Sequence, residues 1–90
     1  MTKQDVRQAA KILNEQIKSG KELLLRPFVE QELLSLVTKD ILLYLGCRFV
    51  SGYKDYMELP YKEIPEKSVE GTILWCSDKI EDQSDVVKVG

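Results

Sequence analysis

Residues 41–59 read ILLYLGCRFVSGYKDYMEL, and the spacing of their apolar side chains changes at Gly46. Before Gly46 the apolar residues are packed as densely as in a buried helix. After it they alternate with polar residues, which is typical of a half-buried β-strand. Because glycine also ends helices, this change of period predicts a chain in which helices are followed by strands.

The alternating part of this stretch predicts a β-hairpin with a two-residue turn at residues 51–52, Ser-Gly. In that register Val50 faces Tyr53. Arg48 faces Asp55, which makes a favourable cross-strand pair of opposite charges. The register also assigns side chains to two faces, with Tyr53, Met57, Leu59 and Tyr61 on one and Phe49 and Tyr56 on the other. A slip of one residue would exchange these faces.

The segment before Gly46 predicts one long helix that runs from Pro27 through Leu45. Proline is favoured at the start of a helix, and the glutamates that follow complement the helix dipole. Residues 41–45, ILLYL, are all apolar or aromatic, and a helix that is apolar nearly all round is buried on several sides. Since so small a chain offers little to cover this segment, we expect it to self-associate as a homodimer.

Residues 2–20, TKQDVRQAAKILNEQIKSG, predict an amphipathic helix with a signal at each end. Thr2 and Asp5 have the spacing of a capping box, in which each side chain accepts the other residue's backbone N–H. Gly20 suits the left-handed turn that ends many helices. The apolar residues between these signals recur at helical spacing and form one face: Val6, Ala9, Ala10, Leu13 and Ile17.

The C-terminal part of the chain predicts strands. Residues 60–71 contain two prolines and several charges, as a loop does, and residues 71–78 read as a short strand. A last strand is expected at residues 86–89. The predicted fold class is α+β, a single domain over residues 1–90, with two N-terminal helices packed on a small antiparallel sheet of three to four strands.

Composition places this chain among ordinary globular domains. Of 90 residues, 43% are hydrophobic and 31% are charged, which is too apolar for a disordered chain. The charge is unevenly distributed: residues 1–26 hold six basic and three acidic side chains (net +3), and residues 27–90 hold seven and twelve (net −5). Such asymmetry marks either a binding surface or two halves of one fold that attract each other.

The sequence predicts a cytoplasmic protein. No run approaches the roughly 18–20 apolar residues that span a bilayer, and the N-terminal segment lacks the apolar region of a secretory signal. The two cysteines, Cys47 and Cys76, fit a reduced compartment, although the sequence leaves open whether they are bridged. Each is interpreted as a small buried hydrophobe rather than a reactive thiol.

The side chains on which enzymes usually depend are scarce here. Histidine is absent, which removes the commonest general base and nitrogen metal ligand, and two cysteines cannot complete a thiolate zinc site. The glycines form no phosphate-binding run. Carboxylates close in sequence are the remaining route to catalysis, but they fall in predicted loops: Glu63, Glu66, Asp78, Glu81 and Asp82. We therefore expect no enzyme, no metal and no cofactor.

The first predicted helix carries a basic face. At 100° per residue, the four cations and one asparagine of this face fall within about 80° of the helix circumference: Lys3, Arg7, Lys11, Asn14 and Lys18. Three interpretations stay open, namely a solvated helix face, a contact for an acidic protein surface, and a set of phosphate contacts for a nucleic acid.

The function expected from these residues is non-catalytic. The leading hypothesis is a small binding protein that acts through protein–protein interaction, with a regulatory or inhibitory purpose, and that forms a homodimer. The alternative is a nucleic-acid-binding accessory protein that uses the basic face of the first helix. Because the chain as a whole is acidic, the protein partner is preferred over nucleic acid. A membrane partner is not expected.

Overall fold

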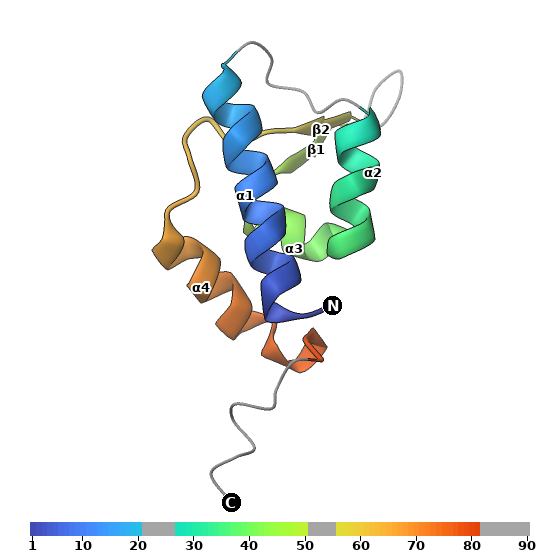
Figure 1. Cartoon of the computed structure of the whole chain (residues 1–90), viewed down its shortest axis with the longest axis vertical. Coiled ribbons are helices and arrows are strands. Elements are labelled where there is room, and N and C mark those ends of the chain that lie inside the picture. Colours follow the sequence, from blue (N-terminus) through green and yellow to red (C-terminus); the bar gives the residue numbers. More distant parts are fainter. Residues whose placement is uncertain (21–26, 51–55, 82–90) are drawn as a thin grey trace, which may run out of the picture.

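The computed structural model describes residues 1–20, 27–50 and 56–81. In chain order these residues form the helices α1 (Lys3–Ser19), α2 (Pro27–Leu36) and α3 (Lys39–Tyr44), the strands β1 (Arg48–Val50) and β2 (Tyr56–Glu58), the helix α4 (Glu66–Trp75) and a 3-10 turn, η1 (Ser77–Lys79). In Figure 1, α1 runs along the front of the molecule with α2 on one side and α4 on the other, and α3 and the strands lie behind it. The fold is α+β and dominated by helices.

Helix α1 forms as its sequence predicts, and both of its end signals are confirmed. The Thr2 hydroxyl accepts the backbone N–H of Asp5 at 3.1 Å, and the Asp5 carboxylate accepts the backbone N–H of Thr2 at 2.8 Å. At the other end Gly20 adopts a left-handed conformation with φ of 71°. These local bonds satisfy groups that the helix itself leaves unpaired, which is why the helix starts and stops where it does.

The single helix predicted over Pro27–Leu45 is wrong, because the chain breaks it into α2 and α3. Thr38 has an extended backbone, with φ of −82° and ψ of 167°, and its hydroxyl accepts the backbone N–H of Ile41 at 3.5 Å. A threonine at this position starts a new helix by capping it. Gly46 ends α3 with φ of 107°, and a Cβ atom there would lie 3.2 Å from the ring of Pro60.

The two strands pair in a register that differs from the predicted one. The predicted pair of Arg48 with Asp55 is wrong, since Arg48 lies opposite Glu58. Phe49 lies opposite Met57, so these two residues share a face and the predicted division of faces is also wrong. Met57 is almost completely buried and Phe49 packs against the core. This apolar pairing favours the observed register, and it still places an acid opposite Arg48. The predicted turn at 51–52 lies outside the described residues.

Helix α4 occupies the segment for which a loop and a strand were predicted. The strand predicted at 71–78 is wrong, and the loop predicted at 60–71 extends only to Pro65, which precedes the first helical residue. The buried residues of α4 and its C-terminal cap follow helical spacing: Val69, Thr72, Ile73 and Cys76. Two strands are therefore present within the described residues, and three to four are not confirmed. The strand predicted at 86–89 lies outside them.

The core gathers apolar side chains from all four helices and from β2. Leu13, Leu33, Ile41, Leu42 and Met57 are among its largest fully buried members. Helix α1 contributes to this core along its whole length, with Val6 near its start and Leu13 near its middle. Helix α4 packs one of its sides toward α1 and exposes the opposite side to solvent.

Candidate functional site

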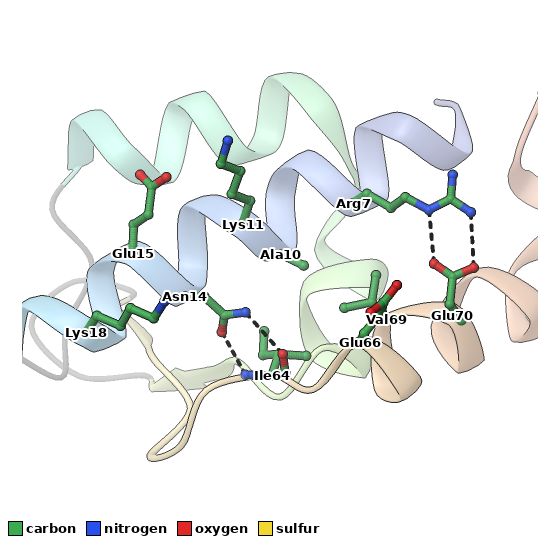
Figure 2. A pocket seen from close by; sticks show the side chains of 10 residues that line it. All are labelled: Arg7, Ala10, Lys11, Asn14, Glu15, Lys18, Ile64, Glu66, Val69 and Glu70. Atoms are coloured by element: carbon green, nitrogen blue, oxygen red, sulfur yellow. Dashed lines mark hydrogen bonds and ion pairs between the residues drawn. The ribbon is translucent and has the colours of Figure 1, made fainter.

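Four of the five residues predicted as a basic binding face line an open groove between α1 and α4. Arg7, Lys11, Asn14 and Lys18 lie along its α1 side, and its volume is about 410 Å³. Its remaining lining residues are apolar or acidic: Ala10, Glu15, Ile64, Glu66, Val69 and Glu70. Figure 2 shows that these come from α1 on one side, and from α4 and the connection before it on the other. We call this the α1–α4 groove.

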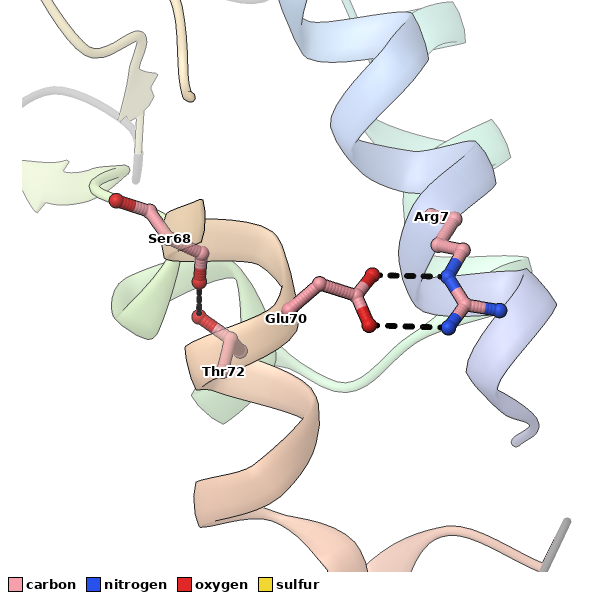
Figure 3. Close-up of polar contacts among 4 residues, drawn as sticks. All are labelled: Arg7, Ser68, Glu70 and Thr72. Atoms are coloured by element: carbon pink, nitrogen blue, oxygen red, sulfur yellow. Dashed lines mark hydrogen bonds and ion pairs between the residues drawn. The ribbon is translucent and has the colours of Figure 1, made fainter. Parts of the chain in front are cut away.

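Arg7 closes one end of the α1–α4 groove by a two-pronged contact with Glu70. Its Nε and one terminal nitrogen donate to the two carboxylate oxygens of Glu70 at 2.9 and 3.0 Å, as Figure 3 shows. The pKa of the Glu70 carboxyl lies below its ordinary value. The hydrogen bonds from Arg7 are the largest cause of this shift. Burial opposes them, and the positive charges of Arg7 and Lys3 lower the pKa by smaller amounts. The pair joins α1 to α4.

Asn14 holds the middle of the groove together. Its side-chain amide donates to the carbonyl oxygen of Ile64 at 3.0 Å and accepts the backbone N–H of the same residue at 2.7 Å. Farther along, the Lys18 ammonium group lies 3.4 Å from a carboxylate oxygen of Glu63. Arg7, Asn14 and Lys18 thus contact residues 63–70 of the same chain, across separations of 45 to 63 residues in sequence.

Of the other two predicted residues, Lys3 lies near Glu70, where its charge helps to lower the pKa of that carboxyl, and Lys11 is exposed on the wall of the groove. Sequence reasoning found the residues of this face but not the acids opposite them. Those acids lie on α4 and the connection before it, where a loop and a strand were predicted.

A second surface lies where α3 and α4 end; the sequence singled out its α3 part, within residues 41–45, but not its α4 part. Four apolar side chains are exposed there by 49, 55, 76 and 77%, respectively: Leu43, Tyr44, Leu74 and Trp75. We call this the aromatic surface. The rings of Tyr44 and Trp75 are stacked, with centroids 6.4 Å apart and planes inclined by 29°. Beside them the Lys79 ammonium group donates to Asp40 at 3.2 Å, and a hollow is lined by this ion pair with Leu43 and Tyr44.

The apolar segment 41–45 contributes to both the core and the aromatic surface. Ile41, Leu42 and Leu45 are buried in the core, whereas Leu43 and Tyr44 are half exposed. Trp75, the only tryptophan, was assigned to a strand, and so its place beside Tyr44 could not be anticipated. A helical reading of residues 66–75 would have set Leu74 and Trp75 apart from the buried positions.

The two cysteines are free and buried. Burial raises the pKa of the Cys47 thiol to about 12. Burial also raises the pKa of Cys76, although the nearby charge of Lys79 opposes it. Both thiols are therefore protonated near neutral pH, and neither has the lowered pKa of a reactive cysteine.

Within residues 1–20, 27–50 and 56–81, no three side chains of the kinds that bind metals gather at one place. In the same ranges no helix has the length and apolar character that a bilayer crossing requires. Comparisons with models of known protein families, with curated proteins and with solved structures found no match.

Proposed function

We propose that this chain is a non-catalytic binding protein of the cytoplasm, a single domain that works without a cofactor and contacts another protein through its aromatic surface. The observation that carries this proposal is the exposed stack of Tyr44 on Trp75, flanked by Leu43 and Leu74. Tryptophan and tyrosine are the residues most enriched among those that dominate binding energy at protein interfaces. The free, buried cysteines support a reducing compartment.

The aromatic surface has the layout of an interface centre with a polar border. Tyr44 and Trp75 are at the ends of short helices whose inner faces are fixed in the core by Ile41 and Ile73. Their stacking holds both rings in one arrangement before any partner arrives, which lowers the entropy lost on binding. The Asp40–Lys79 pair lies at the edge, where polar contacts in interfaces usually lie.

The α1–α4 groove supports nucleic-acid binding less well. Glu63, Glu66 and Glu70 line it or its end, facing the same cations that were expected to contact phosphates. Phosphate would have to compete with the carboxylates for Arg7 and Lys18, and the remaining acids would repel it. An intramolecular use of this face is the simpler interpretation of its charges.

Affinity capture from the source cells tests the proposal. Tagged wild-type protein is compared with a Tyr44→Ala/Trp75→Ala double variant and with Phe28→Ala, a control that removes an equally exposed aromatic ring from α2. The expected result is a protein retained by the wild type and by Phe28→Ala but lost with the double variant. The proposal is wrong if every retained protein is held equally by all three.

Binding to the alternative partner is checked directly. A fluorescent mixed-sequence DNA or RNA is titrated with wild-type protein at low and at high salt. Detectable binding at low salt, weakened by Lys3→Glu/Lys11→Glu and by added salt, would favour the nucleic-acid hypothesis instead.

A further inference from the structure

We infer that the partner seated on the aromatic surface is a second copy of this chain, packed so that the two α4 helices run antiparallel about a twofold axis. The inference rests on the proposed function, since it names the occupant of the same surface. The outward face of α4 supports this inference. Its shape and its charges complement those of the same face on a second copy that is turned by 180°.

Helix α4 divides cleanly into two sides. At 100° per residue, its buried residues with the capping Cys76 occupy an arc of about 100°: Val69, Thr72, Ile73 and Cys76. The exposed or half-exposed residues of the opposite side occupy an arc of about 120°: Lys67, Ser68, Gly71, Leu74 and Trp75. Figure 3 shows Glu70 turned toward Arg7 on α1, with Ser68 turned away from α1.

The outward side of α4 changes from small to large along its length. Ser68 and Gly71 lie toward its start, and nothing lies within 4 Å of the place where a Cβ atom at Gly71 would be. Leu74 and Trp75 lie at its end and are among the most exposed large apolar side chains described. In an antiparallel pair, the large end of each helix lies over the small end of the other. The large side chains of each copy then fill the space over the small residues of the other, and the same contact occurs twice, as in twofold interfaces.

Charge fits the same arrangement. Lys67 lies in the first turn of α4, and Asp78 lies in η1, just beyond the C-terminal cap of α4. Inverting one copy so that Leu74 meets Gly71 brings the start of each α4, which carries Lys67, close to the end of the other, which is followed by Asp78, twice per dimer. Lys67 and Asp78 are both exposed. A parallel arrangement in the same register would instead place each charge against its own like, which is unfavourable.

The stacked ring of Tyr44 gives this interface its width. A ten-residue helix is only about 15 Å long, and a stable interface usually buries roughly 1,200–2,000 Å² in total. Tyr44 and Leu43 extend the apolar area from α4 onto α3, and large aromatic rings contribute the most area per residue. The Asp40–Lys79 ion pair would border this wider contact.

Sedimentation equilibrium of the full chain over a wide concentration range tests the inference. The expected result is a monomer–dimer equilibrium that Trp75→Ala weakens by at least about tenfold, as expected for a central aromatic residue. Phe28→Ala, which removes an exposed ring elsewhere, should leave the dissociation constant unchanged.

Gly71→Gln separates loss of the dimer from loss of the fold. Glutamine favours helices more than glycine does, and the isolated chain has room for it, so the thermal midpoint of the dilute monomer should not fall. The longer side chain fills the gap that Leu74 of the second copy needs, so the dissociation constant should rise about tenfold or more, as a blocked central contact would require.

Charge reversal tests the direction of packing. Lys67→Asp and Asp78→Lys should each weaken the dimer by about threefold to tenfold, and the double variant should return within about threefold of the wild type.

A chain that stays monomeric at the highest concentrations overturns the inference, and so does a dimer whose dissociation constant is unchanged by Gly71→Gln and by charge reversal. If the chain is monomeric yet capture still depends on Tyr44 and Trp75, the surface binds a different protein and the proposed function stands. If both measurements fail, the proposed function fails as well.

Discussion

Removing the Asn14 side chain should destabilise the fold, because one amide satisfies both backbone groups of a distant buried residue. Asn14 donates to the carbonyl of Ile64 at 3.0 Å and accepts its N–H at 2.7 Å. Ile64 is 7% exposed and lies in the connection between β2 and α4. In Asn14→Ala, both backbone groups lose their partner, and the Lys18–Glu63 ion pair remains as a polar contact between the connection and α1.

The size of the effect follows from the two bonds. A hydrogen bond contributes about 0.5–1.5 kcal/mol net, and an unsatisfied buried group costs about 1–3 kcal/mol. Because Asn14 is partly exposed, water can replace some of the lost bonding, and we expect a loss of about 2 kcal/mol in the free energy of unfolding. For a domain of this size that loss corresponds to a fall of about 8–16 °C in the melting temperature.

Urea unfolding followed by far-ultraviolet circular dichroism measures this loss. Asn14→Asp is the graded variant, since its carboxylate still accepts the Ile64 N–H but cannot donate to the carbonyl, and it should fall between the wild type and Asn14→Ala. Lys11→Ala, one turn earlier and exposed, is the control and should change stability by less than about 0.5 kcal/mol. If Asn14→Ala is as stable as this control, the contact does not hold the connection, and Asn14 is free to act as the binding residue that the sequence indicated.

Three further outcomes are expected. Glu70→Gln should remove part of the acid sensitivity of the fold. The lowered pKa of Glu70 means that its pair with Arg7 stabilises the protein above the ordinary glutamate pKa and loses that effect as the pH falls through the folded value. The pair is half exposed, so urea titrations in low salt should show a difference below about 1 kcal/mol, and in high salt almost none. Thr38→Ala should cost about 0.5 kcal/mol, the low end for a helix cap, because its bond to the Ile41 N–H is long at 3.5 Å, while Thr38→Ser should retain most of the stability in the same titration. Cys47 should react with iodoacetamide about a thousandfold more slowly in the native protein than in urea, since its raised pKa leaves little thiolate; mass mapping that found equal rates would contradict this.

The parts of the fold that local bonds determine are those that the sequence predicts well. Helix α1 carries its own start and stop in Thr2, Asp5 and Gly20, and these contacts span only a few residues. The break between α2 and α3 depends on a similar local signal, Thr38, but the apolar residues on both sides hid it. A capping threonine inside an apolar run deserves as much weight as a terminal glycine.

Residues 71–78 were mistaken for a strand because short apolar runs do not distinguish the two periods. Thr72, Ile73 and Trp75 are all residues that strands favour, and Gly71 argues against a helix. What stabilises α4 as a helix is tertiary. Val69 and Ile73 bury one side of it in the core, among side chains from the rest of the chain. None of these partners could be inferred from eight residues alone.

The hairpin register was also mispredicted, because two sequence rules favour different pairings of the strands. Pairing Arg48 with Asp55 satisfied a charge rule, but Phe49 opposite Met57 satisfies a packing rule, and burial of apolar area is worth more than one exposed ion pair. The observed register keeps a charge pair as well, with Glu58 as its acid. Sequence rules of comparable strength can be ranked only when the buried face is known.

The two candidate surfaces depend on each other through α4. Its inner edge is held to α1 by the Arg7–Glu70 pair, and its outer side carries Trp75. Of the basic residues of α1, Arg7 contacts α4 directly, and its pair with Glu70 helps to hold α4 where Trp75 stacks on Tyr44. On this argument, a change at Arg7 would weaken binding at the aromatic surface without touching it, whereas a change at Trp75 would leave the α1–α4 contact and the stability of the monomer nearly unaltered.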